Sequence, residues 1–269
     1  MALTPAPGRP RLVATDLDGT LLRSDGTVSA RTREVLVELD QRGVPVVFVT
    51  GRPLRWMEEL WADVGAHGLA IASNGAILYD VTGRRVREVH GLAREQGLEV
   101  ARAISDGVPG AVFAIETVDG IRLGDGFGAR AELPADTPRG ALSEVWDQDA
   151  VKMLVRHDSL SFEALRDGVT AAVGDLATPS WSMPGLVEIS AAGVTKAATL
   201  ARTSTELGVG QAEVIAFGDM PNDLAMLAWA GTSYAMGNAH PSVLAVAGAT
   251  APTNDEDGVA SVLSEVFGL

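Results

Sequence analysis

The amino-acid sequence predicts an α/β protein with a doubly wound, Rossmann-like parallel sheet and an inserted α+β domain. Three observations lead to this fold class. Near the start of the chain, short apolar runs that end in polar or turn residues alternate with helical patterns. The same alternation returns near the end of the chain. Between the two parts lies a stretch of about 100 residues with mixed strand and helix signals, which is the size of a small domain.

The N-terminal part contains three runs typical of strands buried on both faces, "RLVATD", "VPVVFVT" and "LAIAS". A helix is predicted over "SARTREVLVELDQRG", with Ser29 as its N-cap and Gly43 at its end. A second helix is predicted over "PLRWMEELWADVG". Strands that alternate with helices in this way form a parallel sheet. A hairpin is expected at Asn74-Gly75.

The C-terminal part repeats this pattern, with strands predicted over "AEVIAFGD", "GTSYAM" and "ATAPT" and helices over "TKAATLARTSTELG", "PNDLAMLAWAG" and "HPSVLAVAG". We therefore expect one core domain, formed by residues 1–85 and 186–269. The middle, residues 86–185, contains a helix near residues 92–106, several strand-like runs and a loop rich in proline and glycine. We expect this middle part to fold as the inserted domain.

Composition excludes several classes of protein. The formal net charge of -14 disfavours a nucleic-acid-binding surface, which needs clustered Lys and Arg. The chain has no cysteine, so disulfides and thiolate metal sites are excluded. Neither a signal peptide nor a membrane span is evident, and we expect a cytoplasmic protein with a short frayed tail, either monomeric or a homodimer. Only two of the 21 basic residues are lysines, Lys152 and Lys196.

Polar side chains follow the predicted strands of both halves of the core. In open α/β sheets, ligands bind beyond the carboxyl ends of the strands, where the strand order reverses. Asp16 and Asp18 follow the first strand, and Lys196 begins a helix of the second half. The remaining candidates at strand ends are Thr50, Gly51, Arg52, Asn74, Asp219, Asn222 and Asp223.

Several carboxylates that meet at one edge repel one another unless a cation lies between them. Mg²⁺ suits such a site because it binds carboxylate oxygens together with substrate phosphate. An EF-hand calcium loop does not fit, because the sixth position counted from Asp16 is Leu21 rather than glycine and the twelfth is Thr27 rather than glutamate. The glycine fingerprint of a dinucleotide fold is also missing after the first strand. The sequence therefore predicts Mg²⁺-assisted phosphoryl transfer.

Four motifs together resemble those of the haloacid dehalogenase superfamily of phosphatases. They are "DLDGT", "VTGR", "GVTK" and "GDMPND", and they occur in the order typical of that family. The inserted middle, together with "SNGA" and "MGNAH", is similar to the Cof-type sugar-phosphatase branch, in which a large α/β cap follows the third core strand. The resemblance covers essentially the whole chain. It implies a phosphatase that acts on a small phosphorylated metabolite, with a cap that closes over the substrate and sets specificity.

The resemblance also implies a role for each matching residue. Asp16 becomes the nucleophile and a metal ligand, while Asp18 becomes the general acid/base and binds the metal through its backbone carbonyl. Thr50 and Lys196 bind phosphate, Asp219 is a metal ligand, and Asp223 supports the metal and the lysine. Further phosphate or substrate contacts are expected from Gly51, Arg52, Asn74 and Asn222. The lysine motif departs from the family by continuing into Ala197 rather than glycine.

Other interpretations of the same residues stay open at this point. The aspartates can form turns or cap helices, Asn74 can serve the hairpin alone, and Arg52 can be an ordinary surface arginine. Asn238 and His240 can lie near the site or cap a helix, and Lys152 can contact a substrate or lie on an exposed strand face. For the whole chain, two alternatives are a phosphomannomutase-like phosphotransferase and a phosphate-sensing module without turnover.

Overall fold

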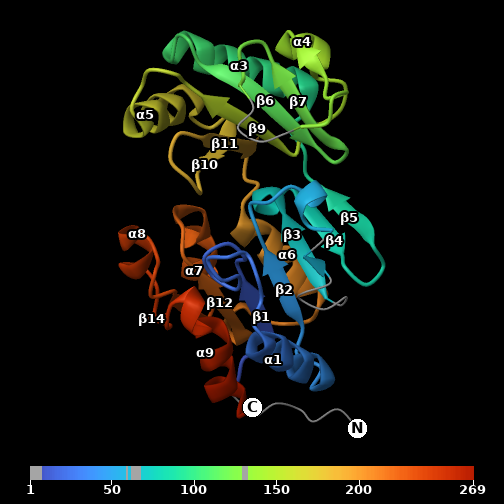
Figure 1. Ribbon diagram of the computed structural model, residues 1–269, viewed down its shortest axis with the longest axis vertical. Coiled ribbons are helices and arrows are strands. Elements are labelled where there is room, and N and C mark those ends of the chain that lie inside the picture. Colours follow the sequence, from blue (N-terminus) through green and yellow to red (C-terminus); the bar gives the residue numbers. More distant parts are fainter. Residues whose placement is uncertain (1–7, 59, 62–67, 129–132) are drawn as a thin grey trace. The chain divides into compact units, whose positions relative to one another are not determined.

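The computed structural model describes residues 8–58, 60–61, 68–128 and 133–269. These residues form two units, one within Met1–Arg52, Trp56–Glu88 and Thr195–Leu269, the other within Pro53–Arg55 and Val89–Val194. The first unit is the core and the second is the inserted domain (Figure 1). Within the described residues, no helix is both long enough and apolar enough to cross a membrane.

The core is built on an eight-stranded sheet with the strand order β14-β13-β12-β1-β2-β3-β4-β5. Its pairings are parallel from β14 to β3, whereas β3 and β4 are antiparallel. The strands are β1 Leu12–Thr15, β2 Val46–Val49, β3 Leu69–Ala72, β4 Ile77–Asp80, β5 Arg85–Val89, β12 Val214–Gly218, β13 Thr232–Ala235 and β14 Ala249–Thr250. Strand order therefore reverses between β1 and β12, which confirms the doubly wound fold class.

Helices cover both faces of this sheet. They are α1 Ala30–Gln41, α6 Lys196–Glu206, α7 Leu224–Trp229, α8 Pro241–Leu244 and α9 Gly258–Phe267. Helices α1 and α9 pack together on one face, and α6 and α7 pack together on the other (Figure 1). The expected cap of α1 is present, because the Ser29 side chain accepts a hydrogen bond from the Thr32 backbone N–H at 3.0 Å. Gly43 follows α1 with a φ of 70°, a left-handed conformation that suits glycine.

Short 3₁₀ turns occupy several connections: η1 Leu54–Trp56, η2 Ser73–Gly75, η3 Gln211–Glu213, η4 Pro221–Asp223 and η5 Asn254–Glu256. The hairpin expected at Asn74-Gly75 is confirmed, since η2 joins β3 to β4. The second predicted helix, over residues 53–65, begins as the 3₁₀ turn η1, and part of it lies outside the described residues. The expected N-terminal tail also lies outside them.

The inserted domain has its own six-stranded sheet, in the order β10-β11-β9-β6-β7-β8. Its strands are β6 Val112–Thr117, β7 Gly120–Gly124, β8 Arg139–Gly140, β9 Lys152–Arg156, β10 Ala177–Ser180 and β11 Val187–Ala191, and its helices are α3 Arg94–Gly107, α4 Leu142–Val145 and α5 Phe162–Val173. The sheet extends past the expected boundary at residue 185, because β11 pairs with both β9 and β10. The short β8 and α4 were not predicted from the sequence.

Strand alternation gives this second sheet one face that packs against α3 and α5 and a second face that combines charged side chains with a smaller apolar cluster, which includes Ala114 and Leu154. Phe113 and Ile115 of β6 pack with α3 and α5 in one buried cluster, which also contains Met153 and Ile189 from the neighbouring strands. The residues between them point to the other face. Lys152 lies on that other face and is only 2% exposed, and its Nζ lies 2.5 Å from Glu188 Oε1. The exposed strand face considered for Lys152 is therefore wrong.

Gly97 in α3 provides a test of packing in the inserted domain. A Cβ at this position would overlap the buried ring of Trp146. Gly→Ala in a helix is ordinarily stabilising by about 1 kcal/mol, but G97A is expected to lower the free energy of unfolding by about 1–3 kcal/mol through overpacking. Urea denaturation checks this. The control is G128A, where an added Cβ meets no atom within 4 Å; stabilisation by G97A would contradict the described packing.

Candidate active site

The site lies at the position where the strand order of the core reverses. Asp16 directly follows β1 and Asp219 directly follows β12, and these two strands are parallel neighbours. The backbone N–H of Asp16 donates a hydrogen bond to the Phe217 carbonyl at 3.0 Å, which continues the pairing past the end of β1. This is the edge at which α/β sheets bind ligands. The structure therefore places both predicted aspartates where the topology predicts a site.

A buried lysine joins two of the predicted carboxylates. Lys196 is the first residue of α6 and is 1% exposed. Its Nζ lies 2.5 Å from Asp16 Oδ1 and 2.6 Å from Asp223 Oδ1. Thr195, the N-cap of α6, accepts a hydrogen bond from the Ala198 backbone N–H at 3.0 Å, which fixes the start of the helix. The ammonium group is thus held between two carboxylates that lie far apart in the sequence.

Asp223 is fully buried and both of its carboxylate oxygens have partners. Oδ1 accepts from Lys196, and Oδ2 accepts from the backbone N–H groups of Asp219 and Met220 at 3.1 and 3.0 Å. The carboxylate therefore closes the turn that carries Asp219. Asp223 therefore does both things expected of it: it forms a turn, and it supports Lys196.

Asp219 is held by a residue to which sequence analysis gave no role. The Thr20 hydroxyl donates a hydrogen bond to Asp219 Oδ1 at 2.8 Å, and both side chains are buried. Gly19 lies against the same carboxylate with a φ of 75°, and a Cβ there would overlap Asp219 Oδ2. The signal was present in the last two letters of "DLDGT", where a small residue and a hydroxyl follow the aspartates.

The three carboxylates form one acidic group. Asp16, Asp219 and Asp223 each offer an oxygen, and these oxygens lie within 4.8 Å of one another. Burial raises the pKa of Asp16 well above its usual range, and the neighbouring carboxylates add to this effect while Lys196 opposes it. Burial, together with the nearby Asp223, raises the pKa of Asp219 to about 7. Three carboxylates beside one ammonium leave an excess of negative charge.

These residues fit a hard divalent cation. The donor atoms are all carboxylate oxygens, which Mg²⁺ prefers. A cation would also relieve the repulsion between carboxylates that adds to the effect of burial on the pKa values of Asp16 and Asp219. The chemistry of the donor set and its uncompensated charge therefore support the predicted kind of metal site.

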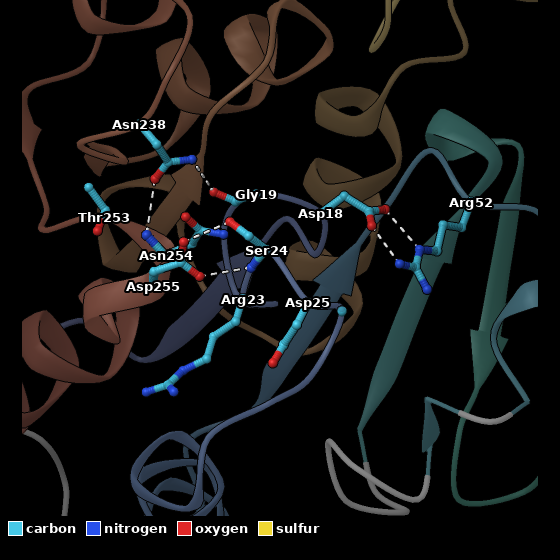
Figure 2. Close-up of a pocket in the computed structure, with 11 residues that line it drawn as sticks. Asp18, Gly19, Arg23, Ser24, Asp25, Arg52, Asn238, Thr253, Asn254 and Asp255 are labelled. Atoms are coloured by element: carbon cyan, nitrogen blue, oxygen red, sulfur yellow. Dashed lines mark hydrogen bonds and ion pairs between the residues drawn. The ribbon is translucent and has the colours of Figure 1, made fainter.

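Asp18 points away from this acidic group. Its side chain is 59% exposed, and Arg52 binds it as a two-pronged fork, with Nε 2.8 Å from Oδ2 and a second nitrogen 2.5 Å from Oδ1 (Figure 2). Leu17, between the two aspartates, is fully buried. The chain leaves β1 at Thr15 and turns, with the Leu22 backbone N–H donating to the Leu17 carbonyl at 2.8 Å, so Asp16 and Asp18 do not share one face as they would in a continuous strand. Arg52 is therefore not an ordinary surface arginine, because it pairs with the carboxylate of Asp18. Its expected contact with phosphate stays a prediction.

The remaining predicted residues form a second group beside β2 and β3. Thr50 is fully buried, its hydroxyl accepts from the Arg52 backbone N–H at 3.0 Å, and its carbonyl accepts from the Asn74 backbone N–H at 3.0 Å. Asn222 donates from Nδ2 to Asn74 Oδ1 at 3.1 Å. A Cβ on Gly51 would approach Asn74 Oδ1 to 3.0 Å. The ends of β2 and β3 and the turn η4 therefore meet here.

Two features of this second group are typical of functional sites. Ser73 and Asn74 have φ values of 51° and 57°, which cost non-glycine residues about 1–3 kcal/mol each. The Ser73 hydroxyl and Asn222 Oδ1 are buried and have no hydrogen-bond partner within the described part of the chain. Buried polar atoms of this kind normally have a partner, which a ligand or water can supply.

Removal of the Lys196 charge tests the electrostatics of the site. K196M should lower the free energy of unfolding by about 3–5 kcal/mol, because it leaves buried carboxylates without their cation. Chemical denaturation without added metal checks this. The control is R87A, which breaks the partly exposed pair of Arg87 with Glu206 and should cost less than about 1 kcal/mol. Equal effects of the two substitutions would contradict the stabilising role of the buried Lys196 ammonium.

Comparison with known proteins agrees with this geometry. A family model described as haloacid dehalogenase-like hydrolase matches residues 13–263. The chain is 30% identical over 270 residues to 5-amino-6-(5-phospho-D-ribitylamino)uracil phosphatase YitU of Bacillus subtilis, across 97% of this chain and 99% of the relative. It is 29% identical over 243 residues to HMP-PP phosphatase of Cronobacter sakazakii, across 87% of each chain.

A solved structure shows the same fold over almost the whole length. The crystal structure of SMU.1108c from Streptococcus mutans matches with a TM-score of 0.83 and 23% identity, over 97% of this chain and 100% of that chain. The resemblance predicted from the four motifs is thereby confirmed. The chain belongs to the haloacid dehalogenase-like hydrolase family.

Proposed function

We propose that the protein is a Mg²⁺-dependent phosphatase that hydrolyses small phosphorylated metabolites through an aspartyl-phosphate on Asp16. The observation that carries this proposal is the divergence of the two aspartates after β1. Asp16 lies in the buried acidic group with Lys196, whereas Asp18, two residues on, is exposed and held by Arg52. One carboxylate can therefore attack phosphorus while the other reaches the leaving group.

The reaction follows from these positions in two steps. In the first, an Asp16 carboxylate oxygen attacks phosphorus, the bond to the leaving oxygen breaks, and Asp18 donates a proton to that oxygen. In the second, Asp18 takes a proton from water, the water oxygen attacks phosphorus, and Asp16 is released together with inorganic phosphate. The second step frees the Asp16 carboxylate and returns the proton to Asp18, so the enzyme returns to its starting state.

The surrounding residues would bind the phosphoryl oxygens. Lys196 is a compact point charge suited to this role, and the Thr50 hydroxyl offers a hydrogen bond. Gly51, Asn74 and Asn222 form the group beside β2 and β3 that we propose as the rest of the phosphate site. Mg²⁺ would be held by Asp16, Asp219 and the Asp18 backbone carbonyl with support from Asp223, and would neutralise charge on the phosphoryl group.

For the substrate class we propose phosphate esters of polar, hydroxyl-rich metabolites such as sugar or polyol phosphates. The names of the curated relatives support small phosphorylated molecules, including a phosphorylated ribityl compound. The face of the second sheet opposite α3 and α5 carries buried Glu116, Lys152 and Glu188. The Ser190 hydroxyl on that face is buried without a partner in the described residues. We propose that these polar side chains of the inserted domain select the leaving group.

Substitution of the nucleophile gives the direct functional test. Wild-type protein should release inorganic phosphate from sugar phosphates and from p-nitrophenyl phosphate. D16N should lower kcat by at least about a thousandfold, because no other group can form the covalent intermediate. The control is D167N, which changes an exposed aspartate in α5 and should leave kcat unchanged. Transfer of phosphate to a second position of the same sugar, without release, would instead favour a phosphotransferase.

Metal binding has a readout that is independent of turnover. Mg²⁺ should raise the unfolding temperature, EDTA should reverse the gain, and KCl at equal ionic strength should not reproduce it. The gain should be larger at pH 8 than at pH 5.5. Because the pKa of Asp219 is raised to about 7, this carboxyl is mostly protonated at pH 5.5 and protons compete with the metal. A gain that is unchanged by D219N would contradict the proposed site.

A further inference from the structure

The loop that carries Asp18, Gly19 and Thr20 is tied to the C-terminal part of the chain. Side chains of residues 238–257 contact it at successive points, and Figure 2 shows the contacts of Asn238 with Gly19 and of Asp255 with Ser24. Asn238 Nδ2 donates to the Gly19 carbonyl at 2.8 Å, and Asn254 Nδ2 donates to the Leu22 carbonyl at 2.9 Å. Further along, Asp255 accepts from the Ser24 backbone N–H and hydroxyl, and Asp257 accepts from the Arg23 guanidinium.

Of these contacts, the one made by Asn238 lies nearest to the proposed chemistry. Its Nδ2 holds the carbonyl of the residue that directly follows Asp18. Its Oδ1 accepts from the Asn254 backbone N–H at 3.0 Å, so both ends of the amide bind backbone groups. Asn238 also lines a cavity of about 680 Å³ together with Asp18 and Arg52. Both of these contacts of the amide are to backbone groups, so Asn238 holds together the wall of this cavity.

The turn that contains Asn238 also contacts Asp219, a member of the acidic group. The His240 backbone N–H donates to the Asp219 carbonyl at 2.8 Å, while the His240 side chain caps α8. One short segment therefore contacts the Gly19 carbonyl through a side chain and the Asp219 carbonyl through its backbone. Gly19 itself lies against the Asp219 carboxylate. Loss of the Asn238 contact would free the Gly19 carbonyl and leave the contact between His240 and the Asp219 carbonyl in place.

We propose that Asn238 is a positioning residue for the phosphatase, which fixes the Gly19 carbonyl and so aligns Asp18 and Thr20 with Asp219. This inference rests on the proposed function. Asn238 touches neither the reacting atoms nor the metal, and it acts through the loop. Because misplacement by about 1 Å can cost a hundredfold in rate, loosening this loop affects turnover more than substrate binding.

The experiment compares N238A and N238D with D255A. N238D keeps an oxygen to accept from the Asn254 N–H but cannot donate to the Gly19 carbonyl. D255A removes the contact at Ser24, five residues beyond Gly19, and serves as the control for general loosening of the loop. For each protein, kcat and KM for p-nitrophenyl phosphate are measured, together with the Mg²⁺ concentration that gives half of the maximal thermal stabilisation.

Both Asn238 variants should lower kcat about tenfold or more with KM within about twofold. They should also raise the half-stabilising Mg²⁺ concentration several-fold, while D255A changes neither quantity. Wild-type kcat and Mg²⁺ response in folded N238D would overturn the proposal, as would a loss of kcat in D255A equal to that in N238D. If the wild-type protein hydrolyses no phosphate ester, the proposed function fails, and the Mg²⁺ response still tests Asn238 on its own.

Discussion

The buried ammonium of Lys196 is the interaction on which the rest of the site depends. It pairs with Asp16 and Asp223 at once, and both carboxylates are almost inaccessible to water. A buried pair of this kind is costly unless its hydrogen bonds are complete. Asp223 meets this condition because its second oxygen closes the turn before η4. The same turn sets the position of Asp219, so one charge network places the carboxylates of β1 and β12 together.

Both lysines of this arginine-rich chain are buried and bind carboxylates. Lys196 does so in the core, and Lys152 does so with Glu188 in the inserted domain. A compact ammonium fits a buried position that the planar fork of arginine would not fill in the same way. Arg52 shows the opposite case, since its fork matches the exposed carboxylate of Asp18 with two hydrogen bonds. The chemistry of each cation thus agrees with the place that it occupies.

Much of the core could be predicted because its strands are short, buried and bounded by turn residues. The candidate residues could be located because parallel strands bring their carboxyl ends to one edge. Contacts between distant segments could not be predicted in this way. Neither the hydroxyl of Thr20 on Asp219 nor the amide of Asn238 on Gly19 follows from a local pattern, because each joins residues about 200 positions apart. The end of the inserted domain was misplaced for the same reason, since β11 is assigned by its pairing with β9.

The proposed mechanism requires that Asp16 carries the phosphoryl group during turnover. The most direct measurement is a single-turnover reaction stopped with acid at successive times, followed by mass spectrometry of the peptide that contains Asp16. We expect a phosphoryl adduct on Asp16 that forms before inorganic phosphate appears and decays as phosphate is released. Release of phosphate with no adduct at any time, or with an adduct on another residue, would contradict it.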